Sequence, residues 1–147
     1  MRKKVFSAVL ACGLLAVVTA ISASAQMPGT TLHATIPFDF IVRGRVLPAG
    51  NYVIRRLNDE PEGLVIFSVN DKRERAIFET ESVDARQIPR TGELVFHRYG
   101  DSYFLSEVFA AGELTGRELP RTRQERSMRR EMASNKAEPE TVALAVY

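Results

Sequence analysis

Short apolar segments separated by turn residues fill the chain from Thr31 to Ala110 and constrain its fold more than any other feature. Several of them alternate apolar and polar side chains, which is the period of a strand with one buried face. Gly, Pro, Asn and Asp occupy the connections, where they suit tight turns. Because short connections join antiparallel neighbours, the pattern predicts an antiparallel sheet protein. We expect strands at 31–42 (interrupted near Pro37 or lying at a sheet edge), 51–57, 64–69, 76–81, 93–99 and 102–110.

The best-defined hairpin surrounds Gly100-Asp101, a favourable pair for a two-residue turn. A loop of that length places His97 opposite Phe104. Because side chains alternate along a strand, His97 and Arg98 are expected on opposite faces. Both faces carry large apolar groups, which favours a central hairpin that is covered on both sides.

Polar side chains of this hairpin are the first candidates for a binding site. In the expected register, Arg98, Tyr103 and Glu107 share one face. A histidine titrates near neutral pH, so His97 would act as a general base if a carboxylate such as Asp101 or Glu107 oriented it. The alternative is an imidazole that packs on Phe104 and has no chemical role. The candidate binding residues are His97, Arg98, Tyr99, Tyr103, Glu107 and Arg117.

A helical pattern replaces the strand pattern after Gly116. Thr122 and Glu125 have the spacing of a capping box, in which Thr122 caps the amide of Glu125 and Glu125 reaches back. The helix then places Met128 and Met132 on one face, where they can dock on the sheet. Its basic side chains are either solvated or bind an anionic surface such as lipid headgroups. The candidate residues for that surface are Arg123, Arg126, Arg129 and Arg130.

The chain begins with the pattern of a secretory signal peptide. Basic residues at Arg2–Lys4 precede an uncharged apolar run from Val5 to Ile21. Small side chains at Ala23 and Ala25 suit signal peptidase, so we expect cleavage before Gln26. The apolar run is short for a bilayer span, and no permanent membrane span is expected after cleavage.

Cys12 opens a second possibility for the leader, because Val9-Leu10-Ala11-Cys12 loosely matches a lipoprotein box. An apolar stretch follows this cysteine in place of the polar tether that a lipoprotein carries. Cleavage before Gln26 would instead remove the only cysteine, and the mature chain would then have no disulfide, no thiolate metal site and no thiol nucleophile.

Charge and composition exclude several classes of function. Cleavage removes three of the twenty basic residues and leaves eighteen acidic ones, so the mature chain would carry one net negative charge. That balance argues against nucleic acid as a partner. His33 and His97 do not have metal-ligand spacing, and the common nucleotide-binding and nucleophile motifs are absent. We therefore expect no metal and no cofactor.

Several segments carry a resemblance to known proteins. They are IPFDF at 36–40, LPAGNY at 47–52, LVFHRYGD at 94–101, YFLSE at 103–107, GRELP at 116–120 and RQER at 123–126. Together they resemble a group of small exported bacterial proteins of unknown function. The resemblance implies export and a β-rich domain, and it implies no activity and no catalytic residue.

These observations predict a mainly-β fold, an antiparallel sandwich or small barrel of about six strands with one C-terminal α-helix, preceded by a signal peptide helix. The expected organisation is a signal peptide at 1–25, a β domain at 26–120, a basic helix at 121–136 and a tail at 137–147, either frayed or forming another edge strand. We expect an exported protein that is periplasmic, at the cell surface or secreted, and that is a non-catalytic binding or structural module. A small periplasmic hydrolase using His97 is the alternative. The expected partner is a cell-envelope component or another exported protein.

Overall fold

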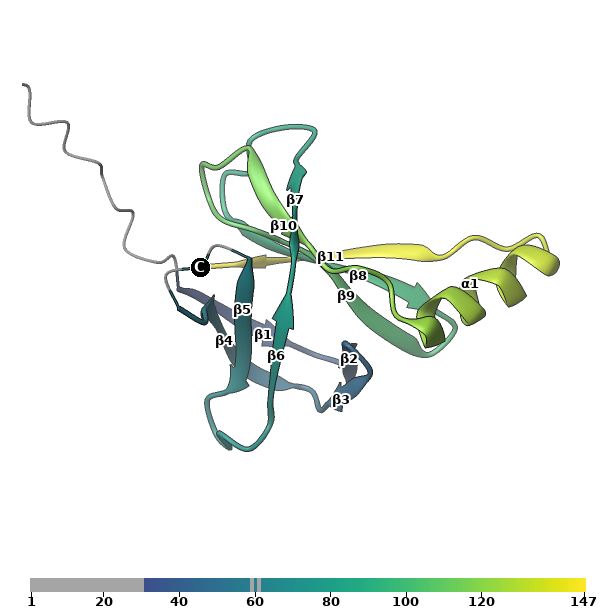
Figure 1. Cartoon of the computed structure of the whole chain (residues 1–147), viewed down its shortest axis with the longest axis horizontal. Helices are drawn as coiled ribbons and strands as arrows, with labels where there is room; N and C mark the ends of the chain where they lie inside the picture. Colours follow the sequence, from purple (N-terminus) through teal and green to yellow (C-terminus); the bar gives the residue numbers. More distant parts are fainter. Residues whose placement is uncertain (1–30, 59, 61) are drawn as a thin grey trace, which may run out of the picture.

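The computed structural model describes residues 31–58, 60 and 62–147, and it contains eleven strands and one helix (Figure 1). The predicted signal peptide lies outside these residues, as do its cleavage residues Ala23, Ala25 and Gln26 and the alternative lipidation residue Cys12. Within the described part, no helix is long and apolar enough to cross a membrane.

The smaller sheet has four antiparallel strands in the order β1-β4-β5-β6. Their bounds are β1 Leu32–Ile36, β4 Gly50–Arg56, β5 Gly63–Ser68 and β6 Arg75–Glu79. Alternating burial in β1 and β6 reflects their period-two sequences. Strand β1 ends at Ile36, because Pro37 has no amide hydrogen to donate to a neighbouring strand. This confirms the predicted interruption near Pro37.

The larger sheet has the order β11-β8-β9-β10-β7, and the short β2–β3 hairpin joins it through a parallel pairing of β2 with β9. Its strands are β2 Phe40–Val42, β3 Arg45–Leu47, β7 Glu81–Asp84, β8 Gly92–Tyr99, β9 Ser102–Phe109, β10 Thr115–Glu118 and β11 Glu140–Val146. The helix α1, Arg123–Ser134, leads from β10 toward β11.

The core lies between the two sheets. Phe96 of the larger sheet is fully buried and meets Phe40 edge to face, with ring centroids 5.7 Å apart. Phe40 in turn meets Tyr52 of the smaller sheet at 5.1 Å. At one corner the sheets are linked by backbone bonds between His33 and Tyr147. They do not close into a barrel, so the sandwich is confirmed and the barrel alternative is wrong.

The expected number of strands was too low. Several strands of three or four residues hold too few side chains to show a period in the sequence, and β2, β3, β7 and β10 are all of this kind. In particular, most of β7 lies after the expected strand at 76–81, where no strand was predicted. The segment expected to be a frayed tail or an edge strand is an edge strand, because β11 pairs with β8 along its whole length.

The central hairpin confirms the predicted register near its turn and departs from it further along. His97 lies opposite Phe104 as expected. A β-bulge then leaves Ser106 without a partner residue, so that Glu107 pairs with Val95. One extra residue reverses the side-chain direction, and Glu107 therefore lies on the face of His97 rather than on that of Arg98.

Candidate functional site

The helix α1 docks on the outer face of the larger sheet through its two methionines, as the sequence predicted. Met128 and Met132 pack against Ile41, Tyr99 and Phe104. The Thr122 Oγ1 atom accepts a hydrogen bond from the Glu125 amide at 3.2 Å and caps the first turn. The helix is therefore fixed at its start and along its apolar face.

Glu125 lies buried under the helix, with 5% of its surface exposed. Its Oε1 atom lies 3.1 Å from His97 Nδ1 and accepts a hydrogen bond from the Tyr99 hydroxyl at 3.3 Å. The Arg121 Nε atom lies 3.8 Å from the same oxygen. Burial, followed by the Glu125 carboxylate, raises the pKa of Tyr99. The second half of the predicted capping box is wrong, because this carboxylate bonds to the sheet instead of reaching back to Thr122.

Ser106 completes a line of three polar side chains. Its hydroxyl lies 3.4 Å from His97 Nε2, on the other side of the ring from Glu125. If Nδ1 carries the proton and donates to Glu125, Nε2 is free to accept from Ser106. This order of hydroxyl, imidazole and carboxylate is that of nucleophilic hydrolases. Ser106 is only 4% exposed, so a substrate would have no direct access to its hydroxyl.

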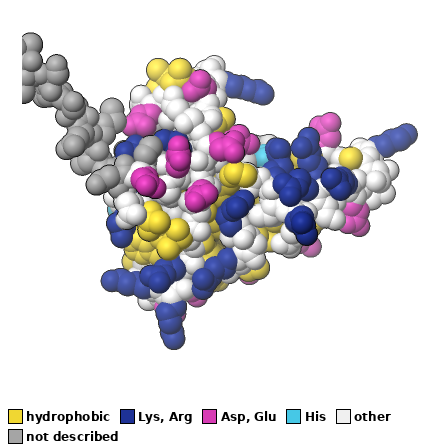
Figure 2. Space-filling view, in the orientation of Figure 1, with side chains coloured by type: hydrophobic (Ala, Val, Ile, Leu, Met, Phe, Trp, Pro, Cys, Tyr) yellow, Lys and Arg dark blue, Asp and Glu magenta, His cyan; other side chains and the backbone are white. Residues whose placement is uncertain are grey.

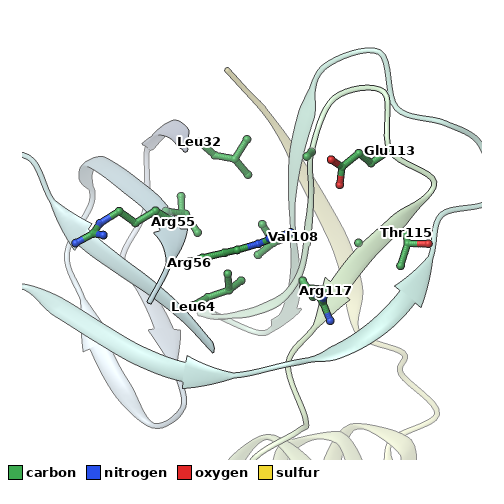
Figure 3. A pocket seen from close by; sticks show the side chains of 11 residues that line it. Leu32, Arg55, Arg56, Leu64, Val108, Glu113, Thr115 and Arg117 are labelled. Carbon is green, nitrogen blue, oxygen red and sulfur yellow. The ribbon is translucent and has the colours of Figure 1, made fainter. Parts of the chain in front are cut away.

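A pocket of about 200 Å³ opens between the two sheets at the end remote from α1 (Figure 3). Its apolar lining comes from both sheets and consists of Leu32, Ile54, Leu64, Val108 and Ala110. Arg55, Arg56, Arg117 and Glu113 stand among its polar residues. The pocket thus combines an apolar interior with a predominantly basic rim.

The Arg56 side chain enters this pocket (Figure 3). It follows Tyr52 and Ile54 at intervals of two along β4, so it shares their inward face, while Arg55 faces the other way. Figure 3 shows Arg56 extending between the sheets toward Val108 and Arg55 pointing away from them. Arg55 instead lies over the Phe67 ring, 5.9 Å from its centroid.

No carboxylate of the described residues lies within ion-pair distance of Arg56. Arg117, a predicted binding residue, also lines the pocket, and it donates a hydrogen bond to the Ser82 hydroxyl at 3.0 Å. The sequence contained a signal for Arg56 that our predictions missed, because an arginine on the apolar face of a strand is unusual.

The predicted face made of Arg98, Tyr103 and Glu107 does not exist, because Glu107 points to the opposite side of the sheet. Arg98 pairs with Glu140 of β11 at 3.1 Å and lies 5.4 Å from the centroid of the Tyr103 ring. Tyr103 also stacks on Phe38. These contacts link β8, β9 and β11, and they engage the side chains of both Arg98 and Tyr103.

Glu107 instead lines a wide hollow of about 690 Å³ on the outer face, which His97 borders together with Glu93 and Asp84. Burial, followed by the nearby Glu118 carboxylate, raises the pKa of Glu107. Figure 2 shows acidic side chains over the upper part of the body and basic ones over α1.

The basic side chains of α1 do not all share one face. At about 100° per residue, Arg123, Arg126 and Arg130 lie more than about 120° from the docked methionines, whereas Arg129 lies on the flank. The first three border a shallow hollow of about 590 Å³. None of the four has an ion-pair partner among the described residues. Binding of an anionic surface by this face stays a prediction.

Within the described part of the chain, no group of three or more His, Cys, Asp or Glu side chains is placed to hold a metal ion. Comparisons with protein-family models, with curated proteins and with solved structures found no match for the chain.

Proposed function

We propose that the protein is exported and that it is a non-catalytic binding module for a small amphipathic anion. The observation that carries the proposal is Arg56, a half-buried guanidinium over an apolar pocket with no carboxylate partner among the described residues. The ligand would place its apolar part between the sheets and its anionic head against Arg56.

Physical chemistry favours this pairing of groups. The electrostatic attraction between a guanidinium and a bound anion is stronger when the guanidinium is partly desolvated than when it is exposed, because water screens the charges less. Its planar fork binds a carboxylate or phosphate through two parallel hydrogen bonds. The volume of about 200 Å³ is below the usual range for drug-sized ligands, so the pocket suits a short aliphatic group whose head stays at the rim.

Arg56→Gln is expected to weaken the binding of octanoate, our probe for a short amphipathic anion, by about 10- to 100-fold. Isothermal titration calorimetry on the exported product measures the dissociation constant. The intact mass of the same sample tests export separately, because it shows whether the chain begins at Gln26. The matched control is Arg90→Gln, which removes the same group from an exposed position outside the pocket and should leave binding unchanged. Octanol, which lacks the charge, should bind more weakly than octanoate. Equal affinities in the two variants, or for the two probes, would contradict the proposal.

A small hydrolase is the second candidate. The distances within Ser106, His97 and Glu125 support it, whereas the burial of Ser106 argues against it. In that case Ser106 would attack an ester or amide carbonyl, with His97 as base and Glu125 orienting the imidazole. A fluorophosphonate probe tests this directly. Labelling that is lost in Ser106→Ala would support the hydrolase, and absence of labelling in the native protein would remove it.

A further inference from the structure

The outer edge of β6 is free of any partner strand among the described residues, since β6 ends the smaller sheet (Figure 1). Backbone bonds from Ser68 to Glu74 and from Thr80 to Glu62 show which residues point toward β5. Because the direction alternates, the backbone groups of Ile77 point outward, away from β5. Its side chain is 55% exposed, which is high for an isoleucine.

The β2–β3 hairpin approaches this edge of β6, and open space remains between the two. An open hollow of about 370 Å³ lies between them, bordered by Val42, Arg45, Ala76 and Ile77. The hollow leaves open space beside Ile77, while the Arg45 guanidinium crosses from the hairpin to the Arg73 carbonyl just before β6. An exposed strand edge of this kind is a template for pairing with another strand.

The sequence of β6 is complementary to itself when read antiparallel. Arg75, Ile77 and Glu79 form its exposed face, with a base at one end, an acid at the other and an apolar residue between them. If two such strands meet around a two-fold axis at Ile77, each Arg75 lies opposite Glu79 of the second copy. Opposite charges facing each other across a ladder are stabilising, and the isoleucines meet each other at the axis.

We propose that two copies of this chain pair through β6, antiparallel and centred on Ile77, which joins their smaller sheets into one continuous sheet. The Ile77 amide of each copy donates to the Ile77 carbonyl of the other, and the Glu79 amide donates to the Arg75 carbonyl. The Arg75 amide is not used, because it already bonds to the Arg73 carbonyl at 3.0 Å. The contact is isologous, so it closes as a dimer instead of growing into a fibre.

Other registers are less favourable. A shift of the strands by two residues replaces the central isoleucine pair with an isoleucine facing a charge, which is Arg75 in one direction and Glu79 in the other. The charges therefore select the register, and they also disfavour pairing with an unrelated apolar strand, since that strand would leave Arg75 and Glu79 without partners.

Sedimentation equilibrium tests the dimer through charge reversal. The interface is small, so we expect the native protein to dimerise at about 100 µM. Arg75→Glu and Glu79→Arg should each weaken the dimer by at least about tenfold, because each brings like charges together twice. A mixture of the two variants should form a heterodimer again, since every facing pair is then of opposite charge. Lys72→Glu, an equal change of charge outside the strand, should have no effect.

Ile77→Pro tests the ladder itself. Proline is tolerated at a sheet edge where its nitrogen faces solvent, so the monomer should keep its circular dichroism spectrum while the dimer is lost. A native protein that stays monomeric at about 1 mM would overturn the proposal. So would a mixture of the two charge variants that fails to associate, or a dimer that persists in Ile77→Pro.

Discussion

Glu125→Ala is expected to lower the free energy of unfolding by about 3–5 kcal/mol, because it removes the buried acceptor that His97 and Tyr99 share. His97 and the Tyr99 hydroxyl would lose their bonds to Oε1, and Arg121 would lose its nearest carboxylate. The helix cap would survive, because Thr122 bonds to the backbone amide of Glu125 and not to its side chain. The loss should therefore reflect the helix–sheet contact and not the helix itself.

Urea denaturation followed by circular dichroism measures this change, and hydrogen exchange locates it. We expect Glu125→Ala to accelerate amide hydrogen exchange more in α1 than in β8. Glu131→Ala is the matched control, since Glu131 lies exposed on the same helix and should change stability by less than about 0.5 kcal/mol. Glu125→Gln keeps an acceptor and should recover part of the loss. If the alanine variants at 125 and 131 were equally stable, the buried network would have no role in holding α1.

Phe96→Ala is expected to cost about 3–5 kcal/mol, since a fully buried aromatic ring would leave a cavity that its neighbours cannot fill. Phe96 meets Phe38 and Phe40 edge to face, with centroids 5.2 Å and 5.7 Å apart. These contacts join β8 to the segment around β2, so the cavity would lie in the centre of the sandwich.

Thermal and urea unfolding of Phe96→Ala should be compared with those of Phe67→Ala. Phe67 loses the same atoms from the outward face of β5, where it lies under Arg55, and we expect a cost below about 1.5 kcal/mol. A small loss in Phe96→Ala, or equal losses in the two variants, would contradict the core as described.

Much of the fold could be predicted from local chemistry. Pro37 ends a strand because it lacks an amide hydrogen, and Gly100-Asp101 sets the hairpin register over the residues next to the turn. Thr122 starts the helix, and the spacing of Met128 and Met132 identifies its docked face. Each of these depends on residues within a few positions of one another, and such interactions can be read along the chain.

The candidate sites were predicted less well, because they depend on contacts between distant segments. Glu107 was assigned to the wrong face, since no local pattern indicated the bulge at Ser106. Glu125 had the spacing of a surface capping residue, and its burial follows only from the position of α1 over His97 and Tyr99. Arg56 is a candidate ligand-binding residue only because β9 and β10 contribute the other side of the pocket.

The succession of short apolar segments and turns by itself determined a mainly-β chain with one late helix, because period, proline and capping preferences act locally. Only the tertiary structure decided how many strands form, which edge stays open and where charged side chains lose their partners. Strands of three or four residues are stable only when a neighbouring strand satisfies their backbone groups, as β7 and β10 do for each other. The outward backbone groups of β6 have no such neighbour, because the described part of the chain supplies no further strand to pair with that edge.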